Sequence, residues 1–94
     1  MTIPDGVQSI GRNALRELTN LTTLEIPGSV KSIGENAFSY CHALESVTIH
    51  DGVLTIGNSA FEFCDALTSL VIPGSVISIG ENAFSCCYAL ESVT

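Results

Sequence analysis

The feature that most constrains this chain is an internal repeat of 23 residues. The chain divides without gaps into four units that each begin with isoleucine: 3–25, 26–48, 49–71 and 72–94. The second and fourth units differ at three positions only. A constant period in the twenties is typical of a solenoid, in which each unit forms one coil and covers the apolar face of its neighbour. We therefore predict a single domain over residues 1–94, built of four stacked coils and cut from a longer array.

Each unit carries two apolar segments that predict two short parallel strands. Val7 and Ile10 and their equivalents supply β-branched side chains for the first strand, and Leu21 and Leu24 and their equivalents open the second. The segment between them, "ENAFSYC" in the second unit, lacks strand alternation and predicts a short helical turn. Gly11 and its equivalents are expected at backbone angles that other residues resist. Stacking then places identical side chains about 4.8 Å apart in ladders. The ladder predicted to form the central spine contains Phe38, Phe61 and Phe84.

The charge of the chain excludes one class of partner. Formal net charge is −7 at pH 7, and the three bases all lie in the first third of the chain. Such a surface repels phosphate backbones, so no nucleic acid is expected, whereas a divalent cation or a basic protein patch is compatible with it. No apolar run approaches the roughly 18 residues of a membrane helix, so the chain is not expected to be membrane-embedded. The sequence "MTIPDG" carries no basic and no apolar segment of a signal peptide.

The spacing of the cysteines predicts a structural role for three of them, with no disulfide bridge and no zinc site. Cys41, Cys64 and Cys87 occupy one slot in successive units, so their Cβ vectors are parallel and too far apart for a bridge. Three thiols in a line also cannot surround a tetrahedral zinc ion. We predict a buried, reduced structural thiol ladder of these three residues. Cys86 has no ladder partner and is expected to react faster.

The histidines supply no catalytic motif. His42 and His50 lie at unrelated positions of their units, and no nucleophile is spaced to form a nucleophile–base pair with either. We expect both to be surface side chains. The prediction is therefore a protein that is not an enzyme, with no catalytic residues, no metal site and no cofactor.

At this point the residues carry a family resemblance. The stretch "LESVTIHDGVLTIGNSAFEFC" resembles the BspA-like, treponemal-type leucine-rich repeat, L-x-x-V-x-I-P-x-x-V-x-x-I-G-x-x-A-F-x-x-C. The first unit departs from it, with Leu15 and Leu18 in place of phenylalanine and cysteine. The resemblance implies a right-handed, β-rich solenoid with the L-x-x-V-x-I segments on its concave side. It also implies a cell-surface or secreted protein that mediates adhesion and protein binding, with a host or matrix protein as candidate ligand.

Two surfaces are candidate binding sites. The first is the outward side of the concave strands, where small hydroxyls and carboxylates form a flat, rigid face with few ordering costs on binding. It lacks the Trp, Tyr and Arg anchors of a hot spot, so a solvated sheet surface is the alternative. Its candidate residues are Thr22, Thr23, Glu25, Glu45, Ser46, Thr48, Thr68, Ser69, Val71, Glu91 and Ser92, and Thr94 completes the last ladder. The second candidate is an apolar edge patch of Tyr40, Leu54, Phe63, Ile77 and Tyr88, which marks a partner site or a surface that a neighbour covers.

The last unit predicts a second kind of contact. It is as apolar as an interior unit, and its outer face is expected to expose Ile79, Phe84 and Leu90 beside unpaired strand groups. We therefore expect self-association through the terminal coils. The alternative function is a structural spacer that self-associates end to end and carries no ligand on its concave face.

Overall fold

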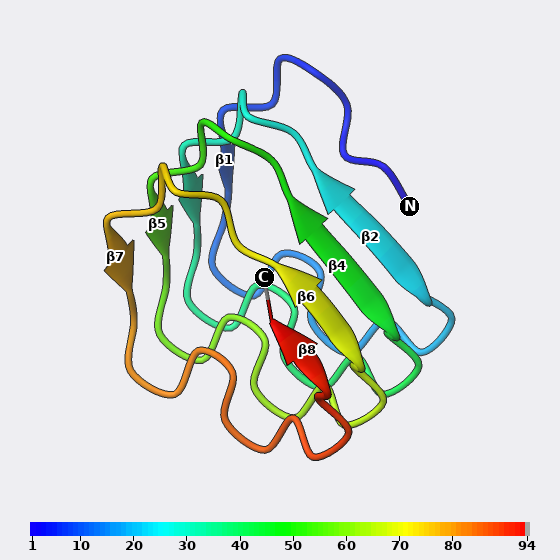
Figure 1. Cartoon of the computed structure of the whole chain (residues 1–94). Helices are drawn as coiled ribbons and strands as arrows, with labels where there is room; N and C mark the ends of the chain where they lie inside the picture. The colour runs from blue at the N-terminus through cyan, green and yellow to red at the C-terminus, as the bar shows by residue number, and fades with distance from the viewer. Residues whose placement is uncertain (94) are drawn as a thin grey trace.

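The computed structural model describes residues 1–93, except for the side chain of Ser92, and consists of short parallel strands stacked in two sheets (Figure 1). The strands are β1 (Ser9–Ile10), β2 (Thr23–Ile26), β3 (Ser32–Ile33), β4 (Ser46–Ile49), β5 (Thr55–Ile56), β6 (Ser69–Val71), β7 (Ser78–Ile79) and β8 (Ser92–Val93). One sheet has the order β1-β3-β5-β7 and the other β2-β4-β6-β8. The chain alternates between the two sheets, so each repeat unit supplies one strand to each.

Residues that pair between neighbouring strands are 23 positions apart, which is the length of one repeat unit. Thr23 pairs with Ser46 and Ser46 with Ser69, and Ser9 likewise pairs with Ser32. Every described strand pair is therefore offset by one unit, and equivalent side chains stack in ladders. The solenoid predicted from the 23-residue period is confirmed.

The core is a row of stacked layers between the two sheets. The rings of Phe38 and Phe61 stack with centroids 5.1 Å apart, and those of Phe61 and Phe84 stack at 5.3 Å. Phe38 and Phe61 are fully buried, and Leu15 packs against the same core in the first coil. The predicted phenylalanine spine is present, and its stacked aromatic contacts join the second, third and fourth coils.

The predicted helical turn between the strands is absent, and residues 1–93 contain no helix. Asn36 and Tyr40 instead adopt left-handed backbone angles, with φ of 57° and 63°. These angles turn alternate N–H groups along the solenoid axis, so that Asn36 N donates to Asn58 O at 3.0 Å and Phe38 N to Ala60 O at 2.7 Å. The N–H groups between these donors close turns within the segment, Ala37 N to Gly34 O at 3.2 Å and Ser39 N to Asn36 O at 3.3 Å. Cross-coil bonds and local turns together satisfy the backbone groups without a helix.

Gly34, Gly57 and Gly80 are required by close approach of the neighbouring coil and not by the backbone angle that the sequence suggested. Positive φ among glycines occurs at Gly6 and Gly52, and not at Gly11, Gly34 or their equivalents. A Cβ placed on Gly57 would lie 2.8 Å from the carbonyl oxygen of Ile33 in the preceding coil. This slot therefore excludes side chains because neighbouring backbones touch there.

Candidate binding surface

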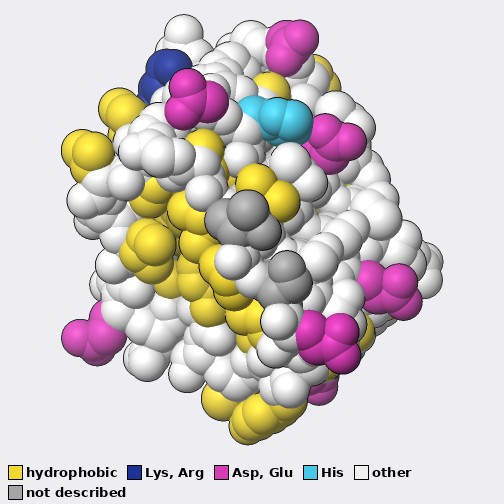
Figure 2. Space-filling view, in the orientation of Figure 1, with side chains coloured by type: hydrophobic (Ala, Val, Ile, Leu, Met, Phe, Trp, Pro, Cys, Tyr) yellow, Lys and Arg dark blue, Asp and Glu magenta, His cyan; other side chains and the backbone are white. Residues whose placement is uncertain are grey.

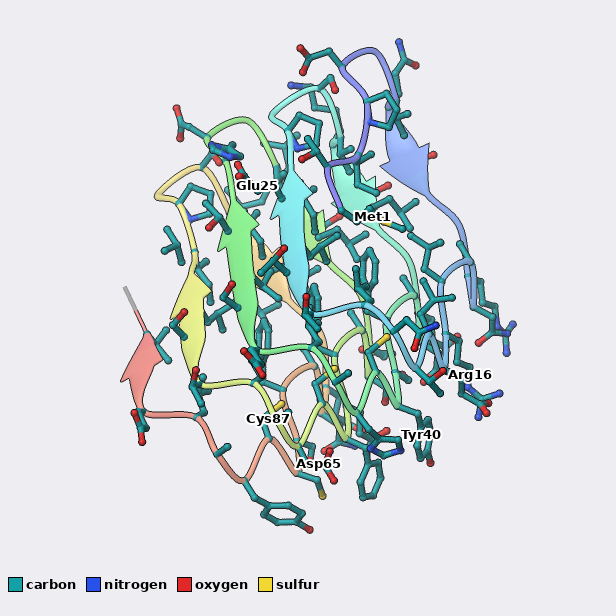
Figure 3. The ribbon with its side chains drawn as sticks, turned by 90° about the vertical axis from the view of Figure 1, so that its right-hand side faces the viewer. Met1, Arg16, Glu25, Tyr40, Asp65 and Cys87 are labelled. Atoms are coloured by element: carbon teal, nitrogen blue, oxygen red, sulfur yellow. The ribbon has the colours of Figure 1, made fainter. Side chains whose placement is uncertain are left out.

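The second sheet presents one face to the core and one to solvent. Along β2, Leu24 and Ile26 are buried while Thr23 and Glu25 are exposed, which is the alternation expected for a sheet covered on one side. Figure 3 shows β2, β4, β6 and β8 side by side with their outer side chains on one surface. This outer surface, called the concave face below, contains the sheet residues named from the sequence.

The members of the concave face differ in exposure. The exposed members are Thr22, Thr23, Glu25, Glu45, Thr68, Ser69, Val71 and Glu91. Ser46 and Thr48, in the middle of the sheet, are half-buried. The structure describes only the backbone of Ser92, and Thr94 lies outside the described residues. The sheet therefore brings these positions onto one surface, as the repeat register predicts.

Backbone hydrogen bonds hold the lower ladder of this face at a regular spacing. Glu45 N donates to Thr22 O at 2.7 Å, Thr68 N to Glu45 O at 2.9 Å and Glu91 N to Thr68 O at 3.0 Å. The hydroxyl of Thr68 adds a bond to the carbonyl oxygen of Glu45 at 3.2 Å. Threonine and glutamate thus alternate on a fixed backbone, so binding orders side chains and not the backbone of this ladder.

The upper end of the concave face carries a pair that sequence reasoning missed. The Nε2 atom of His50 lies 2.8 Å from Oε1 of Glu25, and both side chains are about half exposed. Beside them is a shallow hollow lined by Thr2, Asp5, Glu25, Pro27, Gly28 and His50. The sequence did contain a signal for this pair. Thr48 occupies the repeat position that stacks on Glu25, and His50 lies two residues after Thr48.

The electrostatic character of the concave face is acidic. Glu25, Glu45 and Glu91 project from it, and none of its outward positions is lysine or arginine. Among the described residues, Glu25 is the one carboxylate of the three that is paired, with the His50 imidazole. Such a face favours a partner that brings cationic or hydrogen-bond-donating groups.

The residues grouped as an apolar edge patch do not form one surface. Tyr40 and Phe63 stack at 5.0 Å on the turn segments, with the guanidinium of Arg16 5.2 Å from the Tyr40 ring centroid. Leu54 and Ile77 instead precede β5 and β7, at the opposite end of those strands from the turns that follow them (Figure 1). Tyr88 lies on the last coil. The repeat slot places the two groups in different parts of the coil, so the patch divides into two.

The cysteine that recurs at one repeat position, as Cys41, Cys64 and Cys87, has a structural role. The thiol of Cys64 donates to Phe38 O at 3.2 Å and that of Cys87 to Phe61 O at 3.3 Å, and Cys41 makes the equivalent bond to Leu15 O. Each thiol thus fills a core gap and bonds the preceding coil. The neighbouring Cys41 thiol and burial raise the pKa of Cys64, and burial raises the pKa of Cys87. Cys41 and Cys64 are buried, and Cys86 and Cys87 are half-buried.

His42 is also paired across coils. Its Nδ1 atom lies 2.9 Å from Oδ1 of Asp65, the residue 23 positions later. The shared slot was visible in the sequence, and the pair follows from the ladder register. Among residues 1–93, no three His, Cys, Asp or Glu side chains converge as a metal site, and no helix is long and apolar enough to cross a membrane.

Comparisons with other proteins agree with this geometry. Residues 1–94 match the model of the BspA-type leucine-rich repeat region (6 copies). A leucine-rich repeat protein from Bacteroides capillosus is 38% identical, with a TM-score of 0.86 over 98% of this chain and 72% of that one. A second, from Bacteroides ovatus, is 34% identical, with a TM-score of 0.88 over 94% of this chain and 23% of that one. A leucine-rich cell surface protein from Faecalibacterium prausnitzii is 32% identical, with a TM-score of 0.72 over 99% and 31%.

This chain therefore spans less than a third of the Bacteroides ovatus and Faecalibacterium prausnitzii proteins. Among curated protein sequences, none matches it. Repeat regions of the matched type are generally protein-interaction or surface repeats, and the fold is generally non-catalytic.

Proposed function

Because the chain belongs to the BspA-type leucine-rich repeat family, we propose that it is a non-catalytic protein-binding module whose concave face contacts a protein ligand in adhesion at the cell surface. The observation that carries the proposal is the acidic, hydroxyl-rich outer side of β2, β4, β6 and β8, held at one spacing by backbone bonds. The printed description of the Faecalibacterium prausnitzii neighbour as a cell surface protein supports the location. The ligand class is a host or matrix protein that presents basic residues.

The test is a charge reversal on the concave face. Glu45→Lys combined with Glu91→Lys changes two exposed side chains, so the coil stack should remain folded. Asp51→Lys combined with Asp65→Lys is the matched control, because it makes the same charge change at exposed turn positions of the third coil, outside the concave strands. The 94-residue chain and both variants are passed over immobilised purified extracellular matrix proteins, and retention is measured by surface plasmon resonance.

Each outcome separates the proposal from its alternative. Retention of the parent chain and of the control, with loss of at least about tenfold in affinity for the concave variant, supports binding through this face. Equal retention of all three chains contradicts the concave face. No retention on any matrix protein contradicts adhesion and favours the alternative, a scaffold segment that contacts other chains only through its end coils. The observation that favours this alternative is the exposed apolar surface of the last coil.

A further inference from the structure

Two carboxylates on the concave face have no basic side chain of this chain beside them. The basic and imidazole side chains of the molecule are engaged elsewhere, in contacts that join Arg12 to Glu35, Arg16 to Glu17, Lys31 to the carbonyl oxygen of Gly28, His42 to Asp65 and His50 to Glu25. Within the described part of the chain, Glu45 and Glu91 are therefore exposed acids without a basic partner. Figure 2 shows acidic side chains along the side that carries β2, β4, β6 and β8, whereas the visible basic side chain lies away from these strands.

The stacking of the coils fixes the distance between these two carboxylates. Glu45 and Glu91 occupy the same repeat position two coils apart, and Thr68 occupies it in the coil between them. Backbone bonds from Thr68 N to Glu45 O and from Glu91 N to Thr68 O hold all three in one ladder. Neighbouring strands lie about 4.8 Å apart, so the two glutamates project from backbone positions separated by about 9.6 Å. The hydroxyl of Thr68 donates to Glu45 O at 3.2 Å, which holds this shorter side chain against the backbone between them.

This interval discriminates between the backbone conformations of a partner that supplies the missing cations. A polyproline-II segment has three residues per turn and rises about 3.1 Å per residue, so every third side chain lies on the same side at intervals of about 9.3 Å. A β-strand repeats its side chains on one face at about 6.6 Å. An α-helix repeats them at about 5–6 Å for residues three or four apart, and at about 10.5 Å for residues seven apart. The polyproline-II interval is the nearest match to the two glutamates.

The hydroxyl groups beside the glutamates favour the same conformation. Thr23, Ser46 and Ser69 form the adjacent ladder of the concave face, and the first and last of these are exposed. A polyproline-II backbone has no internal hydrogen bonds, so its carbonyl oxygens can accept from such hydroxyls, whereas an α-helix bonds most of its carbonyl oxygens internally. A polyproline-II segment is also stiff before it binds, so it loses little conformational entropy on a rigid sheet.

We propose that the concave face binds a polyproline-II segment of a protein ligand that carries a lysine or arginine at every third position, with two of these side chains on Glu45 and Glu91. The segment lies along the solenoid axis, across β4, β6 and β8. Glu25 is not part of this row, because it stands in another ladder about 10 Å along the strands and is paired with His50. The inference rests on the proposed function, since it names the ligand class of the same face.

The experiment compares synthetic peptides that present lysine at different intervals. The first peptide consists of four Pro-Pro-Lys triplets. The second has the same composition, but its lysines stand in two adjacent pairs, so that no two of them are three positions apart. The third is an alanine-rich helical peptide with four lysines, one at every seventh position. Fluorescence anisotropy measures the affinity of the 94-residue chain for each peptide at low ionic strength, where charge attraction is least screened.

The expected result is a preference for the triplet peptide of at least about tenfold over the other two. Glu45→Gln combined with Glu91→Gln should remove this preference, whereas Asp51→Asn combined with Asp65→Asn, at exposed turn positions, should retain it. The sharpest variant is Thr68→Glu combined with Glu91→Gln, which keeps the net charge and places two carboxylates one coil apart. It should lose the preference, because an interval of about 4.8 Å does not match every third residue of polyproline II. Circular dichroism checks the fold of each variant.

Equal affinity for the two proline peptides would overturn the proposal, as would tighter binding of the helical peptide or binding of none of the three. Retention of the preference by folded Thr68→Glu, Glu91→Gln chain would overturn it as well. These results are distinct from those that test the proposed function. Loss of matrix binding on charge reversal, without any preference among peptides, would keep the concave face as the binding site and contradict the polyproline-II ligand. A clear preference for the triplet peptide without retention on matrix proteins would keep the ligand class and contradict adhesion.

Discussion

The second and fourth units have nearly the same sequence and different physical environments. They differ at Lys31 and Ile77, at Tyr40 and Cys86, and at His42 and Tyr88. Yet Ile33 is 1% exposed and its equivalent Ile79 is 49% exposed. The difference arises because the second unit has a coil on both sides, whereas the described part of the fourth unit has a coil on one side only. In a solenoid, burial is a property of the pair of neighbours rather than of the unit.

The three positions at which the two units differ show the same dependence on neighbouring coils. In the second unit each side chain reaches the next coil: Lys31 Nζ lies 3.4 Å from Gly52 O, Tyr40 stacks on Phe63, and His42 pairs with Asp65. In the fourth unit, Ile77 and Tyr88 are each 78% exposed. The contacts of the second unit are therefore formed between coils.

The largest expected effect compares the same truncation in both units. Phe38→Ala removes a fully buried ring between two coils and should lower the free energy of unfolding by about 3–5 kcal/mol. Phe84→Ala removes a half-buried ring with one stacking partner and should cost about half as much. Urea unfolding followed by circular dichroism measures both. Equal costs would mean that the fourth unit is as well packed as the second.

A smaller effect is expected from adding one methyl group. Gly57→Ala would place a Cβ 2.8 Å from Ile33 O and should destabilise the chain by about 1–3 kcal/mol. Gly11→Ala is the matched control, because nothing lies within 4 Å of the added atom in the first coil. The control should leave the unfolding midpoint in urea nearly unchanged. A loss of stability at Gly11 equal to that at Gly57 would contradict close approach as the reason for the glycine slot.

The smallest effect concerns the buried thiol at alkaline pH. The pKa of Cys64 is raised in the folded chain by the Cys41 thiol and by burial, so the folded state keeps a proton that the unfolded state releases. Stability is then complete below the unfolded thiol pKa of about 8.5 and falls above it, by up to about 1.4 kcal/mol per pH unit for this group. The Cys64 hydrogen bond lowers the pKa of Cys41 to about 7, so Cys41 contributes stability in the opposite direction as pH rises toward 9 and a nearly constant amount above it. Urea unfolding at pH 9 and 10 should therefore show the decline, and Cys64→Ala should flatten it. The same slope in both chains would assign the decline to other groups.

Much of the candidate surface was predictable because it depends on register. Once Thr23, Ser46 and Ser69 are known to stack, the alternation of β2 places Leu24 inside and Glu25 outside. The His42–Asp65 pair follows from the same register and could have been read from the 23-residue spacing. The division of the apolar edge residues was not predictable, since it depends on which corner of the coil each slot occupies.

The sequence by itself determined the period, the ladders and the identity of the core row, because a 23-residue repeat permits one register in which every apolar slot meets its equivalent. Tertiary structure decided the path of the backbone between the strands. There, left-handed residues such as Asn36 and Tyr40 replace a helix and send three N–H groups of each segment toward the following coil. A local pattern cannot show this, because those hydrogen bonds join residues 22 positions apart and form only when two coils are already stacked.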